Sequence, residues 1–169
     1  MRTPICTFDA MNGILCSQCE SKLDSGKLTK TDVEAAIKLT HLSQKIPQIE
    51  KFTLNSCQES TGNYILYLSS SDIMTVRQSR ELYRLLQGEF PGKIWLVEEN
   101  ALDKKFIEDL FFPVKILSIN RVWAPGNIQK TKVIVSGKRT PRFPIDTDKV
   151  ISITKDMRGI ELVVEFERK

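Results

Sequence analysis

The order of the predicted helices and strands occurs twice along this chain, and it constrains the fold more than any other feature. After residue 28 the apolar pattern predicts a helix, two strands, a second helix and a third strand, and the same order returns after residue 99. A sheet with its helices on one face buries the apolar residues of such a unit economically, and we expect its strands to be antiparallel. The sequence therefore predicts an α+β protein with two units of this kind.

Three segments follow from this pattern: a cysteine-bearing segment over residues 1–28, a first unit over residues 29–99 and a second unit over residues 100–169. In the first unit Thr29 or Thr31 is suited to cap a helix that Pro47 ends. The elements expected in this unit are a helix at 29–46, strands at 51–57 and 64–68, a helix at 75–86 and a strand at 93–98. Those expected in the second unit are a helix at 102–112, strands at 114–123 and 130–136, a helix at 147–157 and a strand at 160–166. The apolar face of the helix at 102–112 is expected to be Phe106, Ile107, Leu110 and Phe111.

The first 28 residues hold three of the four cysteines, in a pattern that indicates a metal site. Cys16 and Cys19 form a C-x-x-C pair, whose two thiolates can reach one ion from a tight turn. Zinc sites of this type often take two further ligands from a second knuckle, and the upstream segment offers Cys6, with Asp9 where a second cysteine belongs. The sequence thus predicts a structural zinc site made by Cys6, Asp9, Cys16 and Cys19.

Two other residues, His41 and Cys57, are reserve candidates for the fourth ligand, since either could fold back onto the cluster. The alternative interpretation is that the cysteines are small buried hydrophobic residues or the remnant of a lost site. A thioredoxin-like redox role fits less well, because no strand precedes Cys16. The N-terminus lacks the apolar core of a secretion signal, so we expect a cytosolic protein whose cysteines are free thiols or metal ligands.

Positive charge is concentrated in the second unit. The formal net charge is +4, but residues 1–102 carry 11 Lys and Arg against 12 Asp and Glu, whereas residues 103–169 carry 14 against 9. A basic half of this kind suits a phosphate-bearing partner, although an ordinary solvated surface explains the charge equally well. No apolar run reaches the ~18–20 residues of a membrane span, so no membrane partner is expected.

A resemblance to a known family rests on two adjacent stretches. Residues 92–99 read GKIWLVEE, and residues 103–116 read DKKFIEDLFFPVKI. Together they resemble the junction between the tandem KH domains of NusA, where a strand of the form G-K-x-I-x-V-V-E precedes a helix that ends in x-P-x-K-V. With its N-terminal cysteines the whole chain resembles the archaeal NusA-like KH proteins, best over residues 90–167. The resemblance implies two KH-like units behind a zinc-knuckle-like segment, single-stranded RNA as the ligand, and a cytoplasmic role in transcription elongation or termination at RNA polymerase.

The loops with which KH domains grip RNA carry a G-x-x-G motif, whose bare backbone clamps the phosphates. The corresponding segments of this chain, residues 70–79 and 137–146, both lack the motif. The second segment offers Lys138, Arg139 and Arg142 for phosphate contacts and Phe143 for base stacking instead. The alternative is a surface turn that two prolines stiffen, with Phe143 turned into the core.

Cations on the predicted hairpin of the second unit extend this candidate RNA surface. Arg121, Lys130 and Lys132 would widen it if they share a face with the loop. Trp123 in the same hairpin is more typical of a core residue or a subunit contact than of a platform for bases.

An enzymatic function is not expected. The sequence contains no P-loop, no G-x-S-x-G, no H-E-x-x-H and no Rossmann fingerprint, and with a single histidine it offers no set of acid, base and nucleophile. Besides RNA binding, the main alternative is a non-catalytic adaptor that uses a degenerate KH scaffold to dock on RNA polymerase or the ribosome. A role in ribosome assembly or translation would use the same surface.

Overall fold

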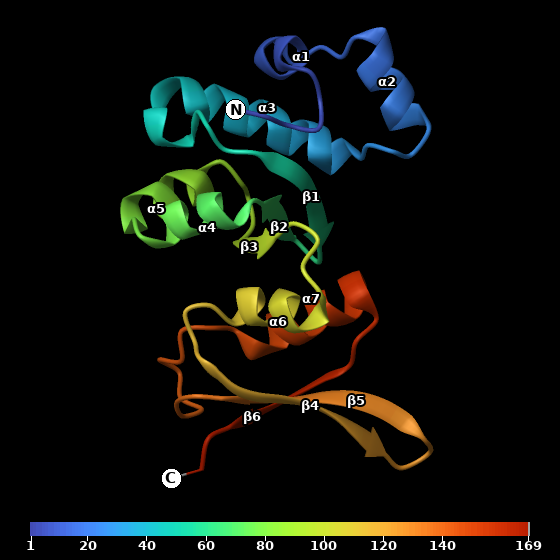
Figure 1. The fold of residues 1–169 in the computed structure, drawn as a ribbon, viewed down its shortest axis with the longest axis vertical. Coiled ribbons are helices and arrows are strands. Elements are labelled where there is room, and N and C mark those ends of the chain that lie inside the picture. Colours follow the sequence, from blue (N-terminus) through green and yellow to red (C-terminus); the bar gives the residue numbers. More distant parts are fainter. Residues whose placement is uncertain (169) are drawn as a thin grey trace. The chain divides into compact units, whose positions relative to one another are not determined.

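The computed structural model describes residues 1–168. The chain divides into two compact units, Met1–Asn100 and Ala101–Lys169, each built around its own three-stranded sheet (Figure 1). The predicted α+β class and the order helix, strand, strand, helix, strand are confirmed in both units, with the second helix of the first unit divided into two. Among the described residues no helix is both long and apolar enough to span a membrane.

The first unit opens with two short helices, α1 (Thr7–Asn12) and α2 (Ser17–Asp24). Neither is long enough to show a clear apolar period, so the sequence pattern gives no bounds for them. The remaining elements of the unit are α3 (Lys30–Lys45), the 3-10 helix η1 (Pro47–Ile49), β1 (Leu54–Ser60), β2 (Asn63–Leu68), α4 (Ser70–Arg77), α5 (Arg80–Gly88) and β3 (Ile94–Glu98).

The sheet of the first unit has the order β1-β2-β3 and is mixed rather than antiparallel. β1 and β2 form an antiparallel hairpin, whereas β2 and β3 run parallel. The expectation of a fully antiparallel sheet is therefore wrong. The helices α4 and α5 carry the chain back along the sheet, so that β3 starts at the same end as β2.

The helix predicted at 75–86 is interrupted. α4 ends at Arg77 and α5 begins at Arg80, and the Oγ of Ser79 accepts a hydrogen bond of 3.2 Å from the N–H of Leu82. Such a cap satisfies an N–H at the start of a helix and fixes where that helix begins. The segment at 70–79, which lacks G-x-x-G, is thus helix α4 and the turn that follows it.

A reciprocal cap fixes the start of α3, and Thr29, one of the two residues expected to cap this helix, provides it. The N–H of Asp32 donates to Thr29 Oγ1 at 3.1 Å, and the N–H of Thr29 donates to Asp32 Oδ2 at 2.9 Å. The other carboxylate oxygen of Asp32 accepts a buried hydrogen bond of 2.7 Å from the N–H of Cys57 in β1. One carboxylate therefore ties the first turn of α3 to the strand beneath it.

Replacing Asp32 with alanine is expected to lower the free energy of unfolding by about 3 kcal/mol, because the change removes the cap and leaves the Cys57 N–H buried without a partner. Urea denaturation followed by circular dichroism measures the loss. Asp24→Ala, at an exposed position of α2, is the matched control and should change the stability by less than about 0.5 kcal/mol. Equal losses in the two variants would contradict this role for Asp32.

The cysteine-bearing segment belongs to the same compact unit as α3 and the sheet. α1 packs against α3, and Ala10 and Cys19 are part of the apolar core. Further towards the N-terminus, Arg2 forms a parallel bridge with Thr53, held by backbone hydrogen bonds of 2.8 and 2.9 Å. Residues 1–28 are therefore anchored on the first unit at several places.

The second unit has the order β4-β5-β6, with β4 and β5 antiparallel and β5 and β6 parallel. Its helices lie on one face of this sheet, as the sequence predicts (Figure 1). The parallel pair again corrects the expected antiparallel sheet, because helix α7 carries the chain back before β6. The elements are α6 (Asp103–Phe111), β4 (Ile116–Ala124), β5 (Ile128–Val135), α7 (Thr147–Arg158) and β6 (Leu162–Phe166).

The core of the second unit is built on α6. All four residues predicted for its apolar face are buried, namely Phe106, Ile107, Leu110 and Phe111. The guanidinium of Arg158 lies 4.4 Å from the centroid of the Phe106 ring and also pairs with Asp103 at 3.0 Å. This contact joins the C-terminal end of α7 to the start of α6.

Candidate metal centre and basic hollow

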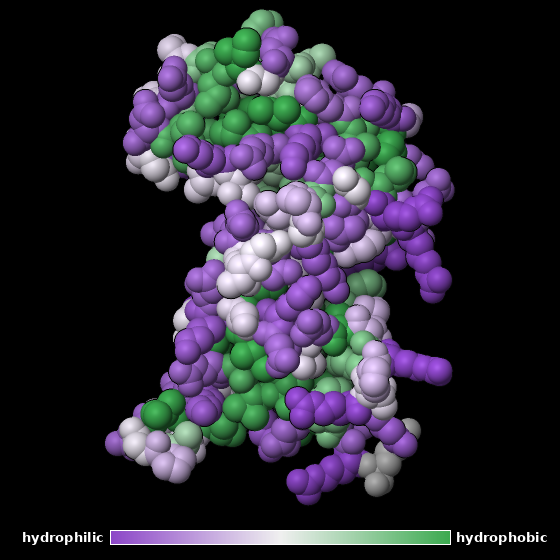
Figure 2. Space-filling model, turned by 180° about the vertical axis from the view of Figure 1, so that it is seen from behind, coloured by the Kyte–Doolittle hydropathy of each residue, from purple (hydrophilic) through white to green (hydrophobic). Residues whose placement is uncertain are grey.

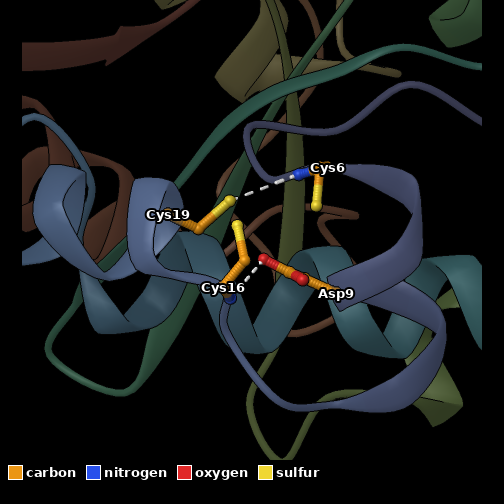
Figure 3. A group of neighbouring side chains, drawn as sticks. All are labelled: Cys6, Asp9, Cys16 and Cys19. Carbon is orange, nitrogen blue, oxygen red and sulfur yellow. Dashed lines mark hydrogen bonds between the residues drawn. The ribbon is translucent and has the colours of Figure 1, made fainter.

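Four side chains of the N-terminal segment converge on one point (Figure 3). Cys6 is the N-cap of α1 and Asp9 lies three residues later; Cys16 is the N-cap of α2 and Cys19 lies three residues later. Residues three apart project from the same face of a helical turn, so each short helix presents two ligand atoms together. The four ligand atoms all lie within 4.8 Å of one another. The structure thus brings together the four residues that the spacing predicts.

Asp9 is the most buried member of this cluster. It is only 1% exposed, and its Oδ2 accepts a hydrogen bond of 2.8 Å from the backbone N–H of Cys16. That hydrogen bond lowers the pKa of the Asp9 carboxyl to about 2, so the group is ionised at neutral pH. The second oxygen, Oδ1, is buried and makes no hydrogen bond within residues 1–168. A buried carboxylate oxygen without a partner is costly, and a cation at this point would satisfy it.

The thiols supply the remaining ligand atoms, and none of the four cysteines forms a disulfide. The N–H of Cys6 donates to Cys19 Sγ at 3.5 Å, which links the two helices at their starts (Figure 3). Burial raises the pKa of the Cys19 thiol to about 12, so the thiol stays protonated near neutral pH until a cation displaces the proton. Three sulfurs and one carboxylate, close together and partly buried, are a donor set that can hold a metal ion.

The two reserve ligands lie elsewhere. Cys57 is buried in β1, outside the cluster, and burial raises the pKa of its thiol to about 12. The Nε2–H of His41 donates to the backbone carbonyl of Met11 at 2.9 Å. His41 therefore holds the end of α1 against α3 and is not part of the cluster.

The loop before α7 forms a second candidate site, which we call the basic hollow. Lys138, Arg139 and Arg142 are all exposed on this loop. Lys138 and Arg142 line a surface hollow with a volume of about 480 Å³, together with Lys115, which precedes β4. Its described lining contains no Asp or Glu. Sequence reasoning missed Lys115, although the residue belongs to the P-V-K-I stretch that carries the family resemblance.

Base stacking requires a ring whose face is open to solvent, and the ring of Phe143 is instead packed against its own unit. Its ring is half buried and packs edge to face against Phe166, with the ring centroids 4.9 Å apart. A Cβ on Gly137 would meet this ring at 3.4 Å. The Arg139 guanidinium lies 5.9 Å from the Phe166 centroid. Phe143 thus forms part of the wall of the basic hollow and packs against Phe166 of its own unit. The groups of the hollow that a ligand can reach are the exposed cations.

The hairpin cations do not form one surface. Arg121 lies directly opposite Thr131, whereas Lys130 lies opposite Val122 and Lys132 opposite Asn120. Neighbouring residues of a strand point to opposite faces, so Arg121 lies on one face of the sheet and the two lysines on the other. Lys132 is also paired with Glu165 at 3.2 Å.

No protein-family model matches the chain, and no curated protein matches it. Among solved structures, the chain is similar to the crystal structure of APE1850, at 20% sequence identity over 77% of this chain and 95% of that one, with a TM-score of 0.44.

Proposed function

We propose that this chain is a cytoplasmic single-stranded RNA-binding protein that acts in transcription elongation or termination, in the manner its resemblance to NusA-like proteins implies. The observation that carries the RNA-binding proposal is the basic hollow. Lys115, Lys138 and Arg142 surround one surface depression whose described lining holds no carboxylate. Phosphate groups are the ligands that such a set of cations favours.

The basic hollow would bind phosphate in a different way from a G-x-x-G loop. In that clamp the backbone N–H groups contact phosphate, whereas here the exposed ammonium and guanidinium groups do so. Each phosphate that a cation neutralises releases condensed counterions, which makes the affinity fall with salt. We therefore expect RNA binding by this chain to depend strongly on ionic strength and weakly on base sequence.

Replacing Lys138 and Arg142 together with alanine is expected to weaken binding of a single-stranded RNA 12-mer at least tenfold at low salt. The slope of log affinity against log salt should fall by about 1.4, since each single-strand phosphate contact contributes about 0.7. Fluorescence polarisation of labelled RNA measures both quantities. Lys45→Ala with Lys51→Ala, two exposed lysines of the first unit, is the control of equal charge change. Equal losses in the two double variants, or no binding at low salt, would overturn the proposal.

A second candidate function is the adaptor that docks on RNA polymerase or the ribosome. The observation in its favour is the exposure of three large apolar side chains close to the metal cluster, Phe8, Met11 and Ile14. Figure 2 shows hydrophobic atoms open to solvent on the first unit. Co-purification of polymerase or ribosomal proteins that survives nuclease treatment, and that is lost in Phe8→Ser with Ile14→Ser, would favour this function.

The ion proposed for the cysteine cluster is zinc. Thiolates with one carboxylate suit zinc, and a tetrahedral ion with metal–sulfur bonds of about 2.3 Å spaces its sulfurs about 3.8 Å apart, which is compatible with ligand atoms that lie within 4.8 Å of one another. Cys6, Asp9, Cys16 and Cys19 would fill all four positions, so the ion would tie α1 to α2 and carry no reaction. Its chemistry there would be structural.

A further inference from the structure

Trp123 stands out because it lies close to the tip of the β4–β5 hairpin and is 71% exposed. The other tryptophan, Trp95, lies in β3 and is 4% exposed. An indole ring stabilises a fold or a complex most when its faces are buried against other groups. The hairpin tip projects at the lower left of Figure 2, where hydrophobic atoms are open to solvent. The fold thus leaves a large aromatic ring exposed to solvent, where another planar group can stack on it.

Two neighbours of Trp123 in the hairpin, Arg121 and Gln129, line a second depression of the same unit, which we call the hairpin groove. The groove has a volume of about 560 Å³, and Arg121, Gln129 and Thr131 line it from the sheet. Trp123 lies directly opposite Gln129 and two residues from Arg121, so it projects from the same face of the sheet. The register therefore places hydrogen-bonding groups of the groove on the same face of the sheet as an exposed aromatic ring.

The charge of this region favours a polyanion. Between Asp109 and Asp146 the chain contains no acidic residue. The same stretch contains the cations Lys115, Arg121, Lys130, Lys132, Lys138, Arg139 and Arg142. A nucleic acid strand can follow such a stretch without meeting a like charge from it.

The rim of the groove that α6 and the start of β6 contribute has the opposite character. Asp103, Glu108 and Glu161 lie there, and two of them are paired, Asp103 with Arg158 at 3.0 Å and Glu161 with Lys155 at 3.9 Å. Carboxylates repel phosphate but accept hydrogen bonds from the amino groups of bases. The groove is thus suited to a base, with the phosphates outside it.

We propose that the hairpin groove is a nucleobase site, in which one base of single-stranded RNA stacks on Trp123 while Arg121 and Gln129 bond to its edge. This inference rests on the proposed RNA-binding function and adds a contact separate from the basic hollow. Lys115 and Trp123 are eight residues apart on β4 or next to it, which corresponds to roughly 26 Å. About eight nucleotides at a stacked spacing of about 3.4 Å cover that length, so one strand can contact both sites.

The test uses the intrinsic fluorescence of the full chain, because Trp123 is exposed and Trp95 is buried. Titration with an RNA 12-mer is expected to quench the Trp123 emission in proportion to binding measured by polarisation. Trp123→Phe should abolish the quenching and keep the affinity within about threefold, since phenylalanine still stacks. Trp123→Ala should weaken binding about tenfold, within the range that base–aromatic stacking contributes. An unchanged melting temperature confirms that both variants fold.

The outcomes separate this inference from the proposed function. If RNA binds and Lys138→Ala with Arg142→Ala weakens it, but Trp123 is not quenched and Trp123→Ala binds as tightly as the wild type, the nucleobase site is wrong and the basic hollow stands. If Trp123→Ala instead converts a dimer into a monomer in sedimentation and leaves RNA affinity unchanged, the ring is a self-association contact and the inference is overturned. Quenching by RNA that Trp123→Phe abolishes supports it.

Discussion

Replacing Cys19 with alanine is expected to abolish binding of the zinc proposed for the cysteine cluster and to lower the free energy of unfolding of the first unit by roughly 4 kcal/mol. Cys19 joins the cysteine cluster to the apolar core, so the change removes a ligand and a buried side chain at once. It also leaves the Asp9 carboxylate buried without a cation, next to an Oδ1 that makes no hydrogen bond in the described part of the chain. Metal analysis of the protein purified without added zinc should give about one zinc per wild-type chain and none for the variant.

The matched control is Cys57→Ala, because Cys57 is the buried cysteine that lies outside the cluster. This variant should keep about one zinc per chain and lose about 1 kcal/mol, the cost of a small buried group. Urea denaturation, with the first unit followed through the buried Trp95, compares the two losses. A wild-type chain that purifies without metal, and is as stable after treatment with a chelator as before, would refute the zinc centre.

Replacing Phe106 with alanine is expected to destabilise the second unit by about 4 kcal/mol. The ring is fully buried in α6, and the Arg158 guanidinium lies over it at 4.4 Å. The substitution therefore opens a cavity in the core and removes the cation–π contact that joins the end of α7 to α6. Thermal and urea denaturation of the full chain should show the transition of the second unit moving to lower temperature and lower urea.

Leu102→Ala is the control variant, because Leu102 directly precedes the same helix and is 81% exposed. It tests whether burial of the side chain, rather than its removal as such, causes the loss of stability. Its stability should stay within about 0.5 kcal/mol of the wild type. The zinc content of both variants should equal that of the wild type, because the cluster belongs to the other unit. A Phe106→Ala variant as stable as Leu102→Ala would show that α6 does not build the core.

Much of the fold could be predicted because local residues decide it. Thr29, one of the two expected capping residues, caps α3, and Pro47 follows its end. The parallel pairing of β2 with β3 could not be read in the same way, since strand direction depends on how the intervening helices return the chain. The break between α4 and α5 at Ser79 could not be predicted either. In the sequence a polar residue within an apolar period looks like part of the solvent-exposed face of one continuous helix, whereas here the Ser79 hydroxyl oxygen caps the start of a second helix.

The candidate sites likewise divide into one that local spacing predicts and one that depends on strand pairing. The spacing of Cys6 with Asp9 and of Cys16 with Cys19 suffices to place the four ligand atoms together, because each pair spans one helical turn. The grouping of Lys115 with Lys138 and Arg142 depends on the pairing of β4 and β5, which no local pattern encodes. The same pairing puts Arg121 on the opposite face from Lys130 and Lys132, and register alone decides this.

The place of Cys19 in the apolar core of the first unit has a consequence for the way the protein is made. Cys19 leaves the ribosome early, but the α3 and β1 residues that share its apolar core are synthesised later, and β1 ends only at Ser60. At roughly 5–20 residues per second, the interval between Cys19 and Ser60 lasts about 2–8 s. Throughout that interval the thiols are open to the surrounding metal ions and oxidants. The zinc proposed for the cluster and the oxidants of the cell would therefore compete for the same thiols before Cys19 is buried.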